Sequence, residues 1–121
     1  MPKKFELLAP AGDIEKAKYA LLYGADAIYF GGELFSLRAS AGNLTVDEIN
    51  EIVEFAHRLN KKCYLTLNIY AHNEDISPLK KYIHQIKSIE IDGYIVSDPG
   101  IIDLIKSEIP NAEIHLSTQA N

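Results

Sequence analysis

The sequence has a single cysteine, no tryptophan and no long apolar run. One cysteine, Cys63, excludes a disulfide within the chain and a metal site built from cysteines alone. No apolar run approaches the roughly 18 to 20 residues that span a bilayer, and the opening segment Met1–Lys4 lacks the pattern of a signal peptide. We therefore expect a cytoplasmic protein.

Basic residues are also few: the chain has 12 lysines and arginines but 17 aspartates and glutamates, which gives a net charge of −5. This balance argues weakly against bulk nucleic-acid binding, which favours basic patches. Lysines occur in three pairs, and we interpret them as parts of solvated turns and helix faces. The pairs are Lys3 and Lys4, Lys61 and Lys62, and Lys80 and Lys81. With 121 residues, 47% of them hydrophobic, the chain is expected to form one domain, residues 1–121, with its own core.

Segments of helical period alternate with short β-rich stretches. The helices are expected to begin at Asp13, at the capping-box pattern of Thr45 and Glu48, at Ser77-Pro78 and at Asp98-Pro99. Gly24 follows the first helix at the position where a residue in the left-handed conformation often ends a helix. The predicted strands are Phe5–Ala9, Ala27–Phe30, Cys63–Ile69, Gly93–Val96 and Ile114–Ser117. Such alternation is typical of βαβ units and a parallel sheet.

The predicted strands carry polar residues on one face only. In the third strand Tyr64 and Thr66 alternate with Cys63 and Leu65, and His115 alternates with its apolar neighbours in the fifth. Because side chains alternate faces along a strand, one face of the sheet is apolar and the other partly polar. Helices outside and a polar lumen inside explain this better than a doubly wound sheet, whose two faces are both covered.

The expected fold class is therefore α/β, a partial (β/α) TIM-type barrel of about four and a half βα units with a parallel sheet that does not close. A closed barrel needs about 200 residues or more, so we expect the chain to be part of a longer protein. Open parallel edges invite pairing, which predicts a homo-oligomer or pairing with the missing C-terminal half.

In β/α barrels, function gathers at the carboxyl ends of the strands. Gly31-Gly32 follows a strand there and allows either a tight turn or a phosphate approach. Arg38 could clamp a carboxylate or phosphate or form a structural salt bridge. Glu6, if it faces the lumen, is either a general base or an anchor for a neighbouring strand.

The histidines give no recognisable catalytic or zinc motif. His115 and Ser117 share a register but lie almost 7 Å apart along a strand, so hydrogen-bonded lumen residues are favoured over a catalytic pair. His57 and His84 are expected to be exposed on helices. Cys63 is expected to be a small buried hydrophobe.

Several motifs in order resemble the opening of the collagenase-like peptidases, peptidase family U thirty-two. The resemblance covers essentially the whole chain and rests on Glu6–Asp13, Gly24–Gly32, Phe35–Ala39, Tyr64–Asn68, Asp92–Gly100 and His115–Asn121. It implies a barrel-like N-terminal region and a peptidase (hydrolase) activity on peptide or collagen. By motif match, the residues implied to line the pocket are Glu6, Tyr29, Arg38, Asn68, Asp98, His115, Ser117, Gln119 and Asn121.

The resemblance also implies an alternative, because other members support hydroxylation of transfer RNA, ribosomal RNA or ubiquinone. Those members use an iron–sulfur cluster held by cysteines further along the chain, beyond residue 121. No cofactor or metal is expected within this chain, and no membrane partner. Three hypotheses follow: a peptidase-like parent with an inactive N-terminal fragment, a hydroxylation protein that acts on RNA or quinone, and a non-catalytic self-associating scaffold.

Overall fold

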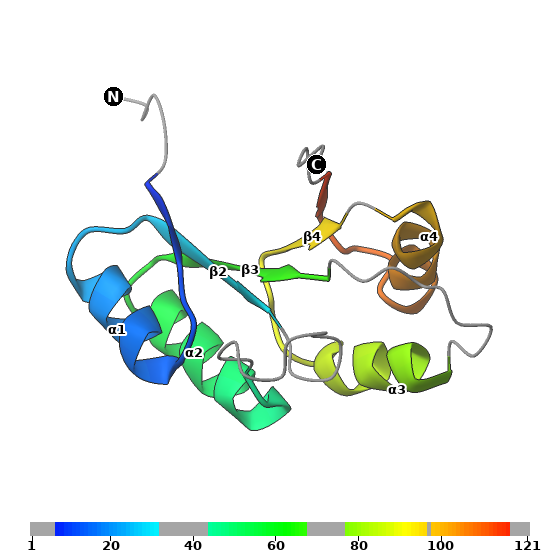
Figure 1. The fold of residues 1–121 in the computed structure, drawn as a ribbon, viewed down its shortest axis with the longest axis horizontal. Helices are drawn as coiled ribbons and strands as arrows, with labels where there is room; N and C mark the ends of the chain where they lie inside the picture. The colour runs from blue at the N-terminus through cyan, green and yellow to red at the C-terminus, as the bar shows by residue number, and fades with distance from the viewer. Residues whose placement is uncertain (1–6, 32–43, 68–76, 97, 117–121) are drawn as a thin grey trace.

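The computed structural model describes residues 7–31, 44–67, 77–96 and 98–116 (Figure 1). Within them strands and helices alternate without exception, as the sequence predicts. In chain order the elements are β1 (Leu8–Pro10), α1 (Ile14–Leu22), β2 (Ala27–Gly31), α2 (Val46–Arg58), β3 (Lys62–Thr66), α3 (Ser77–Ile86), β4 (Gly93–Val96), α4 (Pro99–Glu108) and β5 (Ile114–Leu116).

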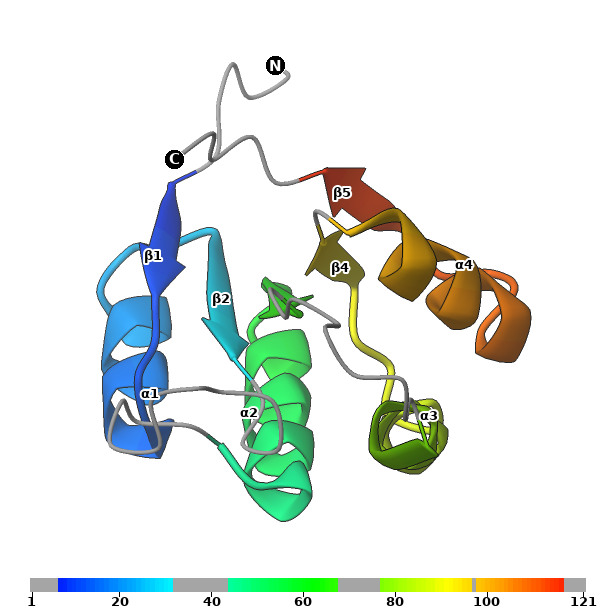
Figure 2. The ribbon, with the colours of Figure 1, turned by 45° about the vertical axis from the view of Figure 1, so that its right-hand side comes forward.

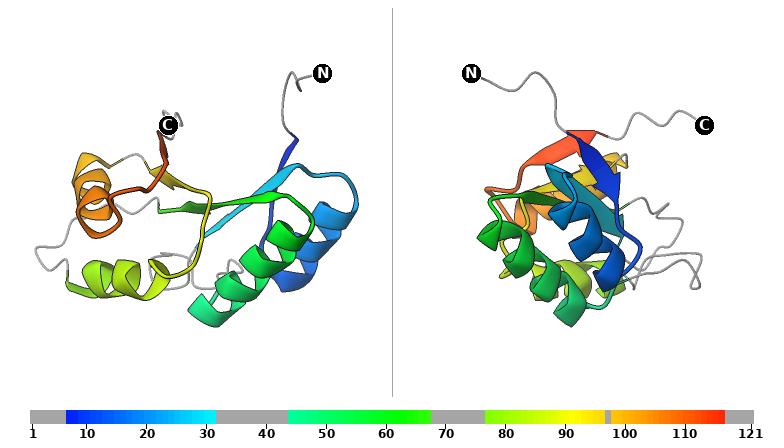
Figure 3. Two further views of the ribbon diagram at one scale, coloured as in Figure 1. Left: turned by 180° about the vertical axis from the view of Figure 1, so that it is seen from behind. Right: turned by 90° about the vertical axis from the view of Figure 1, so that its left-hand side faces the viewer.

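The strands form one parallel sheet in the order β1-β2-β3-β4-β5. Each helix joins two neighbouring parallel strands, and such crossovers are right-handed, so every helix lies on the same side of the sheet. Figure 2 shows the helices in chain order along that side, and Figure 3 shows α1 beside α2 and α3 beside α4. The sheet is not closed, which confirms the partial β/α barrel.

The helix boundaries follow from capping residues that the sequence identifies. The Asp13 carboxylate accepts a hydrogen bond from the backbone N–H of Lys16 at 2.7 Å. Thr45 and Glu48 form the predicted capping box, with reciprocal bonds of 2.9 and 3.1 Å. Gly24 follows α1 with φ of +115°, a conformation that favours glycine. Local sequence therefore determines where these helices begin and end.

Several strands differ by a few residues from their predicted bounds: β2 continues to Gly31, one residue past Phe30, and β3 begins at Lys62, one residue before Cys63. The structure begins β1 at Leu8 and extends it to Pro10, which is tolerated because an edge strand needs no donor on its free side. It ends β3 at Thr66, while Asn68 and Ile69 of the predicted third strand and Ser117 of the predicted fifth lie outside the described residues. Thr66 is paired with Gly31 of β2, and Leu67 after it donates its backbone N–H to the Ile95 carbonyl of β4 at 3.0 Å.

The core lies between the helices and one face of the sheet. That face contributes the almost fully buried side chains of Ile28, Phe30, Leu65 and Val96. The helices contribute apolar residues at helical spacing: Ala17, Leu21, Ile49, Ile52, Val53, Ala56, Ile83, Ile86, Ile101 and Ile105. Apolar burial on this side stabilises the sheet and the helices as one unit.

Two aspartates tie strand pairs together at their amino ends. The Asp26 carboxylate accepts the backbone N–H of Leu7 at 2.9 Å, while its own N–H donates to the Leu7 carbonyl at 2.8 Å. Asp92 repeats this pattern with Cys63, at 2.8 and 3.0 Å. Each carboxylate satisfies a donor of the preceding strand and sets the start of the next pairing.

Asp92 also binds a histidine that was predicted to be exposed. His57 Nε2 lies 2.8 Å from the Asp92 carboxylate, and only 33% of the His57 side chain is exposed. The prediction that His57 is exposed was therefore wrong, because its ring on α2 binds the Asp92 carboxylate at the start of β4. His84 is exposed as predicted, with 67% of its side chain accessible.

Cys63 is a fully buried residue of the helix-facing side of β3, as the sequence predicts. Burial raises the pKa of its thiol from 9.0 to about 12, and the nearby Asp92 carboxylate adds to the rise. The folded chain therefore keeps this thiol protonated and shielded at neutral pH.

We predict that alkaline pH destabilises the chain through Cys63. The thiol of the unfolded chain ionises near pH 9 and that of the folded chain only near pH 12, so stability present below pH 9 is lost as pH rises above it. The free energy of unfolding should fall by about 1.4 kcal/mol per pH unit from this group. Denaturant titrations between pH 8 and about pH 10 measure it; an identical slope in Cys63→Ala would contradict the prediction.

Candidate functional site

The face of the sheet that the helices leave uncovered carries the candidate site. Strand register places Tyr29 beside Tyr64, Thr66 beside Ile95, and Ile95 beside His115. These residues alternate with the core residues, so they lie on the opposite, inner face. Tyr29, Thr66 and Ile95 are half-buried, and His115 is exposed. The wetter inner wall predicted from the alternating pattern is thus confirmed for Thr66 and His115.

Three neighbouring strands bring a tyrosine, a glycine and a histidine together on this face. The rings of Tyr64 and His115 meet edge to face, with centroids 5.1 Å apart and planes at 80°. Between them lies Gly93, which pairs with Tyr64 in register. A Cβ at Gly93 would lie 2.8 Å from the Tyr64 ring and 3.1 Å from the His115 ring. The absence of a side chain at Gly93 therefore allows the two rings to meet.

A carboxylate holds the histidine in this arrangement. Glu113 Oε2 lies 2.7 Å from His115 Nε2, and Glu113 shares the register of His115 because it lies two residues earlier. An ionised carboxylate accepts a hydrogen bond from Nε2–H, which leaves Nδ1 available for a second partner. The pair can therefore orient an imidazole that accepts or donates a proton on the inner face.

The structure describes three of the pocket residues implied by the family resemblance. Tyr29 and His115 lie on the inner face, on β2 and β5. Asp98 caps α4, and its carboxylate accepts the N–H of Ile101 at 3.0 Å, as its position before Pro99 predicts. Its pocket role remains a prediction. Glu6, Arg38, Asn68, Ser117, Gln119 and Asn121 lie outside the described residues.

Sequence reasoning left Tyr64, Gly93 and Glu113 out of the candidate site. Tyr64 was visible as a polar member of the alternating third strand, and Glu113 stands two residues before His115. What the sequence did not contain is the register that places Gly93 between the two rings. A register is a relation between strands, so single-strand patterns cannot provide it.

The described residues do not fit a metal or iron–sulfur centre. No group of three histidine, cysteine or carboxylate side chains among them could hold a metal ion. Iron–sulfur clusters are held by cysteine thiolates, whereas Cys63 is buried on the helix side with its pKa raised to about 12. Cys63 is therefore unsuited to bind such a cluster.

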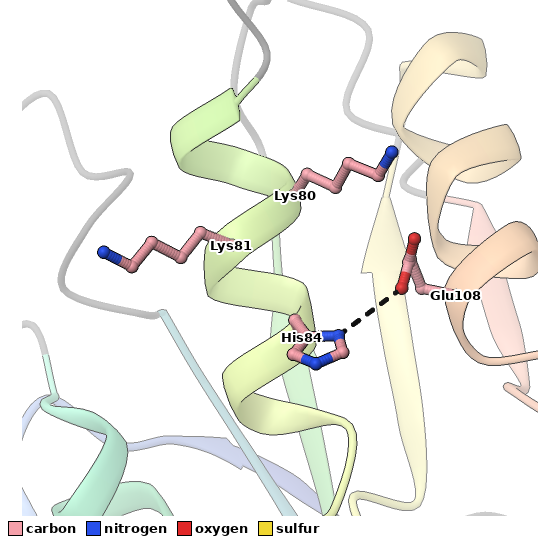
Figure 4. A pocket seen from close by; sticks show the side chains of 4 residues that line it. All are labelled: Lys80, Lys81, His84 and Glu108. Atoms are coloured by element: carbon pink, nitrogen blue, oxygen red, sulfur yellow. Dashed lines mark ion pairs between the residues drawn. The ribbon is translucent and has the colours of Figure 1, made fainter.

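Two surface hollows lie elsewhere, on the outer helical side. One of about 560 Å³ is lined by Glu15, Lys16, Tyr19 and Ala20 of α1. The other, of about 300 Å³, lies between α3 and α4 and is lined by Lys80, Lys81, His84 and Glu108 (Figure 4). In the part of the chain that the structure describes, no helix is both long and apolar enough to cross a membrane.

The fold has a counterpart among solved structures. A structure of the virulence factor SghA with its substrate analogue salicin superimposes with a TM-score of 0.54. The match covers 85% of this chain and 35% of that one at 11% identity, so it concerns the fold alone. The five-stranded sheet and its outer helices define the class of this protein, a β/α-barrel protein.

Comparison of the sequence with family models identifies the family of this chain. The family model "Peptidase family U32" matches residues 12–121, and the chain belongs to that family. This confirms the resemblance.

Relatives of this chain carry two kinds of name. "tRNA hydroxylation protein P1" of Bacillus subtilis is 50% identical over 97% of this chain, and "23S rRNA 5-hydroxycytidine C2501 synthase" of Escherichia coli is 41% identical over 98%. "Collagenase" of Porphyromonas gingivalis is 37% identical over 97%. The chain spans only 28%, 18% and 28% of these proteins, respectively.

We predict that Gly93→Ala destabilises the chain by disturbing the inner-face rings. The new methyl group would overlap the Tyr64 ring, and overpacking of this kind costs about 1 to 3 kcal/mol. Urea titration measures the loss. Gly12→Ala is the matched control, because a Cβ there has no atom within 4 Å. In a Tyr64→Ala background the cost of the Gly93 change should shrink; an undiminished cost would show that the rings are not its cause.

Proposed function

We propose that this chain forms part of the substrate-facing wall of a protein that takes part in hydroxylation of transfer RNA. The observation that carries the proposal is the 50% identity with tRNA hydroxylation protein P1 along 97% of the chain. Proteins named for tRNA hydroxylation in Helicobacter pylori and Escherichia coli, at 44% and 38% identity, support it further.

The peptidase hypothesis has weaker support. The collagenase of Porphyromonas gingivalis and an uncharacterised protease of Methanocaldococcus jannaschii are 37% and 39% identical. Peptide hydrolysis by covalent catalysis needs a nucleophile beside a base. Among the described residues, Cys63 is buried away from His115 on the opposite face of the sheet, so these two do not form such a pair.

Under this proposal the inner face contacts the nucleotide that reacts. RNA-binding proteins hold unstacked bases with aromatic rings and with hydrogen bonds to the base edges. Tyr29 and Thr66 offer such groups, and the His115 ring held by Glu113 offers a proton donor or acceptor. The role assigned to His115 is to hold or move a proton at Nδ1, with Glu113 as its positioning residue.

An iron–sulfur cluster, if the whole protein carries one, would be held outside this chain. The family resemblance implies cysteine ligands further along, and Cys63 does not fit as one. The chain contributes substrate contacts and proton handling under this proposal, and cluster chemistry belongs to another part of the protein.

We predict that this chain can replace the matching segment of tRNA hydroxylation protein P1 in Bacillus subtilis. The chimera should restore hydroxylated nucleosides in tRNA, and His115→Gln should lower the rate of their formation about 100-fold, the order that one acid–base group contributes. Glu113→Gln should have a smaller effect. Mass spectrometry of digested tRNA, which detects nucleosides heavier by one oxygen atom, measures both.

Glu54→Gln is the control, because Glu54 is exposed on α2, outside the inner face and away from α3. A folded chimera that restores no hydroxylation would refute the proposed function. Restored hydroxylation that His115→Gln leaves unchanged would refute only the role of His115.

Self-association is a second candidate, and the edge strands favour it. Among the strands that the structure describes, β1 and β5 each pair with one neighbour, and Leu7, Leu8 and Leu116 at these edges are 55%, 44% and 67% exposed. Exposed apolar edges pair readily with another strand. We propose that a second copy, or the other half of a longer barrel, covers them.

We predict that the isolated chain associates with itself through these edges. Light scattering after gel filtration, at up to about millimolar concentration, should give a mass above that of one chain. Leu116→Lys should weaken association, because an edge lysine opposes strand pairing. The control is Leu22→Lys on α1, an equally apolar side chain that is 61% exposed away from the edges. A monomer at every concentration would contradict the prediction.

A further inference from the structure

The outer surface of α3 has a charge distribution unlike that of the rest of the chain. From Ser77 to Ser88 the sequence contains three lysines and a histidine and no acidic residue. Lys80, Lys81, His84 and Lys87 are all exposed. The net charge of −5 is therefore unevenly distributed, and α2, with Asp47, Glu48, Glu51 and Glu54, carries part of the acidic excess.

The two lysine side chains extend to opposite sides of α3. Figure 4 shows Lys80 reaching toward α4, across the hollow from Glu108, and Lys81 pointing away from α4. The Glu108 carboxylate lies 3.7 Å from His84 Nδ1. Among the described residues no carboxylate forms an ion pair with Lys80 or Lys81. Both side chains are exposed, so an outside partner can reach their ammonium groups.

This arrangement suits an extended polyanion better than a single phosphate. Two ammonium groups that point apart cannot converge on one small anion, but they can contact separate phosphates along a backbone. Contacts of lysine with backbone phosphates supply most of the sequence-independent affinity of proteins for nucleic acid. Lys80 and Lys81 also lie in the half of α3 that follows the carboxyl end of β3, the end of a β/α barrel where substrates bind.

We infer that Lys80 and Lys81 form a docking surface for the phosphate backbone of RNA. This inference rests on the proposed function and extends it: the inner face would hold the reacting nucleotide while α3 holds the RNA beside it. It also changes the interpretation of the Lys80 and Lys81 pair, which the sequence alone suggested to be a solvated helix face.

The test compares two lysine pairs in the 121-residue chain. Lys80→Gln with Lys81→Gln removes two charges from α3, and Lys61→Gln with Lys62→Gln removes the same charge from the start of β3, at the opposite end of the sheet. Binding of total tRNA is measured by fluorescence anisotropy from about 50 to 200 mM salt. The α3 variant should bind about tenfold or more weakly, with a salt slope shallower by about 1.4 to 1.8.

The control variant should retain the affinity and slope of the parent chain. Equal weakening in both variants, an unchanged α3 variant, or tRNA binding by none of the three proteins would each overturn the inference. Thermal melts check that the variants remain folded. The chimera that tests tRNA hydroxylation is a separate measurement, so a chimera that restores hydroxylation while the α3 variant binds tRNA normally would refute the docking surface alone.

Discussion

The helices of this chain bury only one face of its sheet, and the other features depend on that asymmetry. Right-handed crossovers between successive parallel strands place every helix on the same side. Apolar residues such as Ile28 and Leu65 meet the helices there, so the alternate residues of each strand are directed to the inner face. The position of Cys63 shows the same rule: a residue on the helix-facing side becomes an inert, protonated thiol, while Tyr64 beside it reaches the inner wall.

Hydrogen bonds at the amino ends of the strands support this arrangement. Asp26 and Asp92 each bind the backbone N–H of the preceding strand and return a bond to its carbonyl. Asp92 binds His57 as well, which links α2 to the start of β4. These contacts lie at the end of the sheet opposite to the βα loops. The chain thus separates a stabilising end from the end where β/α barrels bind substrates.

The two proposed RNA contacts use different physical properties of the chain. The inner face offers an oriented imidazole, since Glu113 fixes the His115 ring and Gly93 leaves room for Tyr64 beside it. The outer surface of α3 offers positive charge rather than a shaped binding site, because the side chains of Lys80 and Lys81 point to opposite sides of the helix. Proteins that modify RNA need both, because backbone contacts position the nucleic acid and contacts to the base define the reacting atom.

The sequence by itself determined the alternation of strands and helices, most helix caps and the polarity of the two sheet faces. These properties arise from neighbours along the chain, such as Thr45 with Glu48 or Tyr64 with Leu65, so local patterns contain them. Only the tertiary structure decided the place of Gly93 between two rings, the pairing of His57 with Asp92, and the meeting of Tyr64 with His115. Those depend on register and on contacts between residues far apart in the chain, which are fixed when the sheet assembles.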